Sequence, residues 1–168
     1  MRKLNLLFII ILAGLFTACG YSDEFNEFNH ENTFVISFPD YMEECNDFQA
    51  DLELKNSYRN TYGFVKVYDK EGRTFEEFQQ EMLGVLKGYE LLNDVLVTDS
   101  FYRDTDGFQA IDIELYGVMQ DENIYYWHSC FESAGKFFEV VCWTRSMDRK
   151  QRYGPDLEKV IASFRPLL

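Results

Sequence analysis

The spacing of apolar residues changes twice along this chain, and these changes limit the folds it can adopt. In "TFVISFP" the side chains of Phe34, Ile36 and Phe38 alternate with others, which is typical of a half-buried strand that ends at Pro39. From Arg73–Gly88 the apolar residues recur at helical spacing, and afterwards the alternation returns. A chain that passes from strands to a helix and back to strands predicts an α+β fold.

A helix is expected between Thr74 and Gly88. Thr74 is followed three residues later by Glu77, a capping box in which each side chain accepts a hydrogen bond from the other residue's backbone amide. Gly88 follows the last apolar residue and is typical of a helix end. Two shorter stretches before this helix, "ADLELKNSYR" and "GFVKVYDKEG", predict strands, with Leu52 and Leu54 facing the core.

Four alternating stretches after this helix predict an antiparallel meander. The pair Asp106-Gly107 is typical of the tight turn between two such strands. A three-residue turn at 133–135 is expected in the last hairpin, where it would pair Cys130 with Phe138.

The chain is expected to close with a helix that has Pro155 as its first residue and Leu157, Val160 and Ile161 on one face. Residues 137–143 are apolar on both faces, so helices should cover both sides of the sheet. The 168 residues suit one domain. The fold class predicted is α+β, an antiparallel sheet sandwiched by helices.

The amino-terminal segment predicts where the protein is located in the cell, and it is not expected to be part of the folded domain. Arg2 and Lys3 precede an apolar run, Leu6–Phe16, that is too short for the roughly 20 residues of a permanent membrane span. Residues 1–18 are therefore interpreted as a signal peptide, with a membrane anchor as the alternative.

The stretch "FTAC" resembles a bacterial lipobox, in which the chain is cut before a cysteine that carries a diacylglycerol. The resemblance implies that Cys19 is the lipidated first residue of the mature protein, anchored by acyl chains such as palmitate. Ordinary secretory cleavage beside an incidental Cys19 is the alternative.

Residues 19–32 are expected to form a flexible acidic tether, since 21–32 hold four acidic residues and no basic one. The motif "SDE" resembles the export signal of Bacteroidetes lipoproteins, which implies the outer membrane, on its periplasmic or cell-surface face. Docking of Phe25 and Phe28 on the domain is the alternative to a free tether.

The charge of the chain limits its partners. The formal net charge is −13, and removal of residues 1–18, with Arg2 and Lys3, lowers it to −15. Such a chain is repelled by nucleic acid and by anionic lipid headgroups. A protein partner selected by charge would be basic, whereas the plainer interpretation of the charge is solubility.

The order of elements from residue 33 to residue 168 resembles the PsbP-like, or DcrB-like, α/β/α sandwich. The residues that carry the resemblance are the opening "FVISFP", the junction "VYDKEGRTFEEF", the meander and the closing "SFRPL". The resemblance implies a non-catalytic role, because relatives include photosystem II accessory subunits, envelope lipoproteins, a Ran-binding factor and chaperones of secreted toxins. It brings no catalytic residues.

Three cysteines remain besides Cys19. The predicted register places Cys130 and Cys142 too far apart for a disulfide, and leaves open a bridge from Cys45 to either one. The same register puts His128, Cys130 and Cys142 on one face, where a zinc site is conceivable. Because the spacing matches no metal motif, a buried hydrogen-bonded His128 is favoured, and neither a metal nor a cofactor is predicted.

Common enzyme signatures are missing from the sequence. It holds no GxSxG elbow, P-loop, GxGxxG or HExxH motif, and its two histidines are His30 and His128. The expectation is that the protein is not an enzyme.

An aromatic surface is the one candidate ligand site. Tyr125, Trp127 and Phe131 alternate on one face, and with Trp143 on the next strand they are hypothesised to form a platform for a partner or a sugar ring. Packing under the terminal helix is the alternative.

The leading functional hypothesis is an envelope lipoprotein that binds a protein as an accessory or assembly factor. A narrower form of it is an acidic immunity protein that neutralises a basic toxin. The alternative is a surface lipoprotein that captures a small molecule or glycan.

Overall fold

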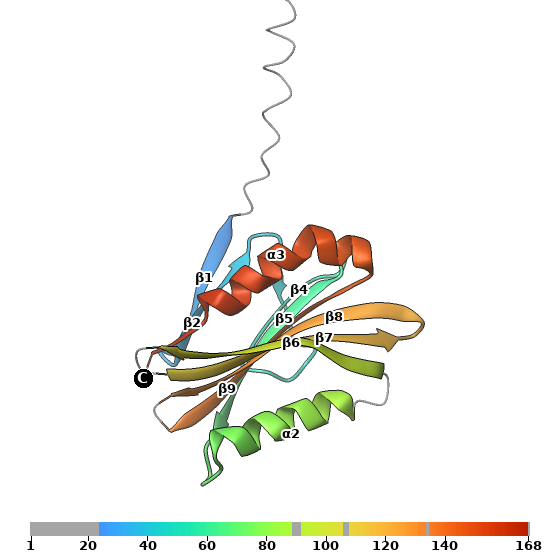
Figure 1. Cartoon of the computed structure of the whole chain (residues 1–168). Helices are drawn as coiled ribbons and strands as arrows, with labels where there is room; N and C mark the ends of the chain where they lie inside the picture. The colour runs from blue at the N-terminus through green and yellow to red at the C-terminus, as the bar shows by residue number, and fades with distance from the viewer. Residues whose placement is uncertain (1–23, 89–91, 106–107, 134, 168) are drawn as a thin grey trace, which may run out of the picture.

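The computed structural model describes residues 24–88, 92–105, 108–133 and 135–167. In this part of the chain a seven-stranded antiparallel sheet lies between two helices, α2 (Phe75–Lys87) on one face and α3 (Met147–Ser163) on the other (Figure 1). A second sheet of three strands lies beside α3. The architecture confirms the predicted single-domain α+β sandwich.

The large sheet has the order β3-β4-β5-β9-β8-β7-β6, so that β3 and β6 are its edges. Its strands are β3 (Glu43–Glu44), β4 (Leu52–Asn56), β5 (Thr61–Asp69), β6 (Asn93–Thr105), β7 (Phe108–Met119), β8 (Glu122–Ser133) and β9 (Lys136–Arg145). The small sheet has the order β1-β2-β10, from β1 (Phe25–His30), β2 (Phe34–Pro39) and β10 (Arg165–Pro166).

Helix α2 confirms the predicted capping box. The amide of Glu77 donates to Thr74 Oγ1 at 3.2 Å, and the amide of Thr74 donates to Glu77 Oε2 at 2.8 Å. Gly88 caps the carboxyl end, and Phe78 and Met82 are buried against the sheet.

Helix α3 starts earlier than predicted. Its first residue is Met147, and Pro155 lies inside the helix rather than at its start. Pro155 is exposed, so its missing amide weakens the helix on the solvent side while the neighbouring Gly154 and Leu157 are buried against the sheet.

Strand β1 corrects the expectation of a flexible tether for Phe25–His30, which lie within the predicted tether 19–32. Phe25–His30 pair antiparallel with β2, from Phe25 opposite Pro39 to His30 opposite Phe34. The Phe28 ring lies edge-on to the Phe38 ring, with their centroids 6.0 Å apart. Phe28 therefore docks on the domain, which was the alternative to a free tether. The signal segment 1–18, Cys19 and the rest of the predicted tether up to residue 23 lie outside the described residues.

The core has two parts, one on each face of the large sheet. The part under α3 and β2 includes Phe34, Phe38, Phe131, Phe138, Leu157 and Phe164, and the part under α2 includes Phe78, Leu115, Ile124, Phe137 and Val141. A Cβ at Gly63 would lie 2.6 Å from Phe38 Cε1, so β2 packs this closely only over a glycine. Within the described ranges, no helix combines the length and hydropathy that a membrane span needs.

The β8–β9 register differs from the prediction by one residue. The hairpin has a two-residue turn, with Ser133 opposite Lys136 and Gly135 at φ 82°, so Cys130 pairs with Glu139 instead of Phe138. Since strand side chains alternate between faces, this slip moves every β9 side chain to the face opposite the one predicted.

Candidate binding site

The predicted aromatic platform is divided between the two faces of the sheet. Tyr125, Trp127 and Phe131 are buried in the core part under α3, as the alternative interpretation had it. Trp143 lies on the other face, where its ring stacks on Tyr62 at a centroid distance of 5.0 Å. The four residues therefore form no common surface, and the prediction was wrong about their arrangement.

His128, Cys130 and Cys142 do not converge either. Cys142 pairs with Trp127 and faces α3, whereas His128 and Cys130 face α2. Among the described residues no group of three potential metal ligands comes together. Cys45, Cys130 and Cys142 are all free thiols, so neither bridge from Cys45 forms.

His128 is buried and hydrogen-bonded, as expected from the sequence. Its Nε2 lies 3.0 Å from Glu139 Oε1, and Tyr68 donates its hydroxyl to the other Glu139 oxygen at 2.8 Å. Burial, with the Glu139 charge, raises the pKa of Tyr68. Burial and the same charge raise the pKa of Cys130, and burial raises that of Cys142, so both thiols stay protonated.

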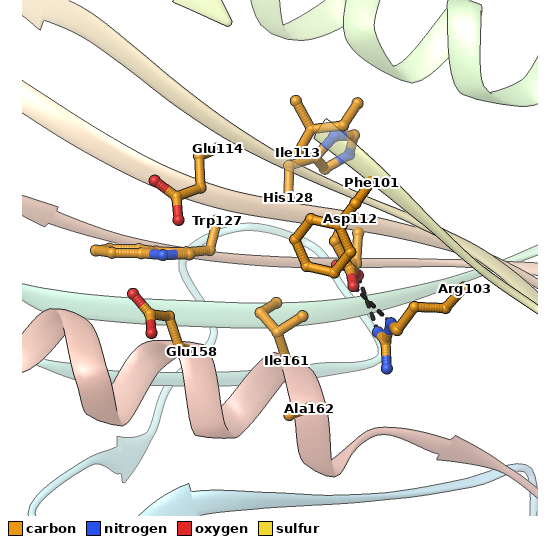
Figure 2. Close-up of a pocket in the computed structure, with 11 residues that line it drawn as sticks. Phe101, Arg103, Asp112, Ile113, Glu114, Trp127, His128, Glu158, Ile161 and Ala162 are labelled. Carbon is orange, nitrogen blue, oxygen red and sulfur yellow. Dashed lines mark hydrogen bonds and ion pairs between the residues drawn. The ribbon is translucent and has the colours of Figure 1, made fainter. Parts of the chain in front are cut away.

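A cleft lies between α3 and the strands β6, β7 and β8. It has a volume of about 300 Å³. Figure 2 shows Phe101 and Arg103 from β6, Asp112 and Glu114 from β7, Trp127 from β8, and Glu158 from α3 around it. We call it the Trp127 cleft.

Arg103 is held at one side of the Trp127 cleft by a two-point ion pair. Its Nε lies 2.5 Å from Asp112 Oδ2, and its Nη2 donates to Asp112 Oδ1 at 2.9 Å (Figure 2). Ser129 also donates its hydroxyl to Asp112, and the guanidinium lies 5.3 Å from the Phe131 ring centroid. The charges of Arg103 and Asp112 therefore compensate each other.

Trp127 forms the aromatic wall of the cleft. Its side chain is only 5 % exposed, and its Nε1 has no hydrogen-bond acceptor among the described residues. A Cβ at Gly154 would lie 3.1 Å from the indole, so α3 approaches the ring closely at a glycine. A buried N–H without an acceptor is costly to the fold.

Two carboxylates flank the indole in the view of Figure 2, those of Glu114 and Glu158. Glu114 has a long ion pair with Lys150, at 3.8 Å, and exposed Glu158 makes none among the described residues. An aromatic wall with carboxylates at its mouth suits a cation on an apolar stem, as in the side chains of arginine and lysine.

Strand β6 runs along the open side of this cleft as the last strand of the sheet. It is thirteen residues long and carries large apolar side chains that face solvent. These are Leu96, Val97, Phe101 at 52 % exposure and Tyr102 at 73 %. An edge strand with exposed apolar side chains is a ready template for another strand.

Sequence reasoning missed the cleft residues Phe101, Arg103, Asp112, Glu114 and Glu158. Trp127 was a candidate for the wrong reason, as part of an exposed platform. A usable signal was "SFYR", where two aromatic residues stand in a strand whose other residues are mostly polar, as on an edge strand with solvent-facing side chains.

Comparison with known proteins identifies the fold. No protein-family model matches the sequence, and no curated protein matches it. The solution structure of cyanobacterial PsbP (CyanoP) from Synechocystis sp. PCC 6803 is similar, with a TM-score of 0.67 and 14% identity, over 89% of this chain and 97% of that one.

Two further structures are similar. The Saccharomyces cerevisiae Ran-binding protein Mog1p gives a TM-score of 0.61 at 7% identity, over 87% of this chain and 97% of that one. LpqN, involved in cell envelope biogenesis of Mycobacterium tuberculosis, gives 0.57 at 12% identity, over 87% of each chain. At these identities the likeness establishes the fold alone, and this fold is the PsbP-like and Mog1-like α+β sandwich.

Proposed function

We propose that this chain is a non-catalytic binding protein of the cell envelope that captures an extended, basic segment of a protein partner along β6. The observation that carries the proposal is the position of the Trp127 cleft directly beside an open, apolar sheet edge. The similar structures include a Ran-binding protein and a protein of envelope biogenesis, which is consistent with a binding role on this fold.

A partner segment that pairs with β6 as an additional strand uses both the open sheet edge and the Trp127 cleft. Residues directly opposite each other in a sheet point to the same face, so a partner residue beside Phe101 projects its side chain on the Phe101 face, where the Trp127 cleft lies. Backbone hydrogen bonds to β6 supply affinity, and the cleft selects the side chain at that one position.

Charge selects the partner's side chain. An arginine or lysine in the cleft contacts the indole of Trp127 and the carboxylates of Glu114 and Glu158. The guanidinium of Arg103, already paired with Asp112, repels it little. The net charge of −13 steers a basic partner toward the protein over a longer range.

The anchor on Cys19 completes the proposal. A diacylglyceryl group there holds the domain at a membrane surface, and the acidic motif after it favours the outer membrane, on its periplasmic or cell-surface face. Metabolic labelling with a palmitate analogue tests this part: label should be incorporated into the whole chain and lost in Cys19→Ala.

The binding surface is tested by photo-cross-linking in cells of the native host. A photoreactive phenylalanine replaces Phe101, and a matched control replaces Tyr58, which is 92 % exposed but lies away from β6. We expect a discrete adduct from position 101, whose cross-linked peptide contains arginine or lysine, and none from position 58.

Charge reversal sharpens the test. Glu158→Lys should reduce the adduct at position 101 by on the order of tenfold, whereas Glu43→Lys, an exposed carboxylate on the other sheet edge, should leave it unchanged. An adduct that is insensitive to Glu158→Lys contradicts the proposal. The narrower immunity role further requires a neighbouring gene that encodes a basic secreted effector.

A further inference from the structure

The outer edge of β6 is regular over only part of its length. Two irregularities interrupt its pairing with β7, one between Asn93 and Leu96 and one between Val97 and Asp99. From Asp99 to Thr105 the register is continuous, and β6 is the last strand of the sheet. Helices α2 and α3 pack on β8 and β9, away from this edge (Figure 1). The regular segment therefore offers an uninterrupted row of backbone donors and acceptors to a further strand.

The regular segment carries charges on the face of the sheet where the Trp127 cleft lies. Phe101 and Arg103 line this cleft, and Asp99 lies directly opposite the cleft residue Glu114 on β7. Like charges directly opposite each other destabilise a pair of strands. Lys150 lies 3.8 Å from Glu114, whereas exposed Asp99 forms no ion pair among the described residues. The position of Asp99 thus favours a cation on the outer side of β6.

A second copy of the chain carries such a cation at the matching position. Two antiparallel copies of β6 can be related by a two-fold axis that passes beside one residue, which then lies opposite itself. With the axis at Phe101, Asp99 lies opposite Arg103 of the second copy. The next symmetric registers have the axis at Ser100 or at Tyr102, and neither brings opposite charges together. The edge is therefore self-complementary in one register.

We propose that β6 pairs antiparallel with β6 of a second copy, with Phe101 at the two-fold axis. The Phe101 ring, now 52 % exposed, then packs on its own copy, and an Asp99–Arg103 pair lies on each side of it. Arg103 keeps its pair with Asp112 in the dimer. Its Nε and Nη2 are directed to Asp112, and Nη1 is left for Asp99 of the second copy.

The dimer is expected to be weak. Pairing from Asp99 to Arg103 gives a small interface, and the net charge of −13 on each copy opposes association. The pairing does not depend on the proposed protein partner, but it uses the same edge. Where both form, the second copy closes β6 until a partner displaces it.

Disulfide trapping tests the register on the whole chain in detergent, with glutathione disulfide as the oxidant. Phe101→Cys places a thiol opposite its own copy, with Cα atoms about 4.5 to 5.5 Å apart, which is within disulfide range. We expect a covalent dimer that forms faster by on the order of tenfold than in Tyr58→Cys, at a position that is 92 % exposed but lies outside β6. The unsubstituted chain gives the background from its own cysteines.

Two further combinations fix the register. Asp99→Cys alone should give no covalent dimer, because its two copies are displaced by about 13 Å along the strands. A mixture of Ser100→Cys and Tyr102→Cys chains should cross-link, because these positions lie opposite each other. No covalent dimer from Phe101→Cys, an equal rate from Tyr58→Cys, or an equal rate from Asp99→Cys alone overturns the proposal.

Charge reversal gives a test without cysteines, in which sedimentation velocity in detergent measures the dimer dissociation constant. Asp99→Lys sets two cations opposite each other and should raise the constant by on the order of tenfold. Glu43→Lys makes the same change of charge on the other sheet edge and should leave it unchanged. An equal change in both variants, or none in either, overturns the proposal.

The dimer and the proposed partner can fail separately. Trapping and sedimentation contain no other protein, so their results hold whether or not a host partner is found. In the photo-cross-linking experiment, a self-adduct from position 101 has twice the mass of the chain, which separates it from an adduct with another protein. A self-adduct alone supports the dimer and contradicts the proposed partner.

Discussion

The two edges of the large sheet are built in opposite ways. Edge strand β3 has two residues, the exposed Glu43 and Glu44, and the loop that follows it is fastened to the buried Glu53. Edge strand β6 has thirteen residues and exposes large apolar side chains beside the Trp127 cleft.

Short length and charge are usual protections of a sheet edge against pairing with other chains, and β3 has both. Strand β6 has acidic residues, but it is long and exposes Leu96, Val97, Phe101 and Tyr102, which is a liability in a protein that lacks a partner for this edge. Under the proposed function, β3 closes the fold and β6 is kept open for binding. Variants at the β3 edge should therefore change stability, and variants at the β6 edge should change binding.

The largest loss of stability is expected from Glu53→Ala. The Glu53 carboxylate accepts hydrogen bonds from the amides of Asp47 at 2.5 Å, Phe48 at 2.8 Å and Ala50 at 2.6 Å. Its removal leaves three part-buried donors without an acceptor and should lower the free energy of unfolding by about 3 kcal/mol in urea denaturation. Glu44→Ala, at an exposed position nearby, should change it by less than ~0.5 kcal/mol.

The Glu53 network should also depend on pH. Burial opposes the charge of Glu53, but the three backbone amides outweigh it and lower its pKa below the ordinary 4.5. Because the folded pKa is the lower one, the stabilisation is complete above pH 4.5 and is lost as the pH falls through the folded pKa. The difference in unfolding free energy between the wild type and Glu53→Gln should shrink below pH 4.5. A difference that grows in acid contradicts this account.

Asp112→Asn should cost less, about 2 kcal/mol, because Arg103 loses its two-point carboxylate partner but keeps partial contact with solvent. Urea denaturation measures the loss. The same variant removes the charge that compensates Arg103, so the Trp127 cleft becomes less negative and the cross-link from position 101 should weaken. A more intense cross-link would show that the pair opposes binding.

Phe101→Lys should separate stability from binding, because it removes the exposed ring and places a like charge beside the basic side chain of the partner. Phe101 is 52 % exposed, so the free energy of unfolding should change by less than ~0.5 kcal/mol. Partner binding, measured by interferometry once cross-linking has identified the partner, should fall by on the order of tenfold, which corresponds to ~1.4 kcal/mol. A stability loss as large as that of Glu53→Ala would contradict the difference between the edges.

Among these variants, Trp127→Phe is expected to have the smallest effect on partner binding. Phenylalanine keeps an aromatic wall but removes Nε1, which has no acceptor among the described residues. The free energy of unfolding should fall by only ~1 kcal/mol from lost packing. Partner binding should weaken a few-fold, because the larger indole ring gives a stronger cation–π contact with the bound basic side chain than phenylalanine does. Unchanged binding would exclude the indole from the contact.

Features that depend on neighbouring residues were predictable from the sequence. The capping box of α2 follows from Thr74 and Glu77 alone, and the strand at Phe34–Pro39 from its own alternation. The β8–β9 register was not predictable, because a two-residue and a three-residue turn both fit at Gly135. This one-residue difference in register places Trp143 on the face of the sheet opposite Tyr125, Trp127 and Phe131.

The Trp127 cleft was beyond sequence reasoning for a different reason. Arg103, Trp127 and Glu158 come from β6, β8 and α3, and they meet only because α3 lies across the sheet without covering β6. No local pattern records that packing. The earlier start of α3, at Met147 rather than Pro155, was not predictable either, because proline is typical of a first helical position.

The most direct test is amide hydrogen exchange at the two edges, measured on the whole chain with and without the partner identified by cross-linking from position 101. The partner should slow exchange in β6, around Phe101, by on the order of tenfold or more, and leave β3 and β4 unchanged. Equal protection of both edges, or protection at β3 alone, would contradict the assignment of β6 as the binding edge.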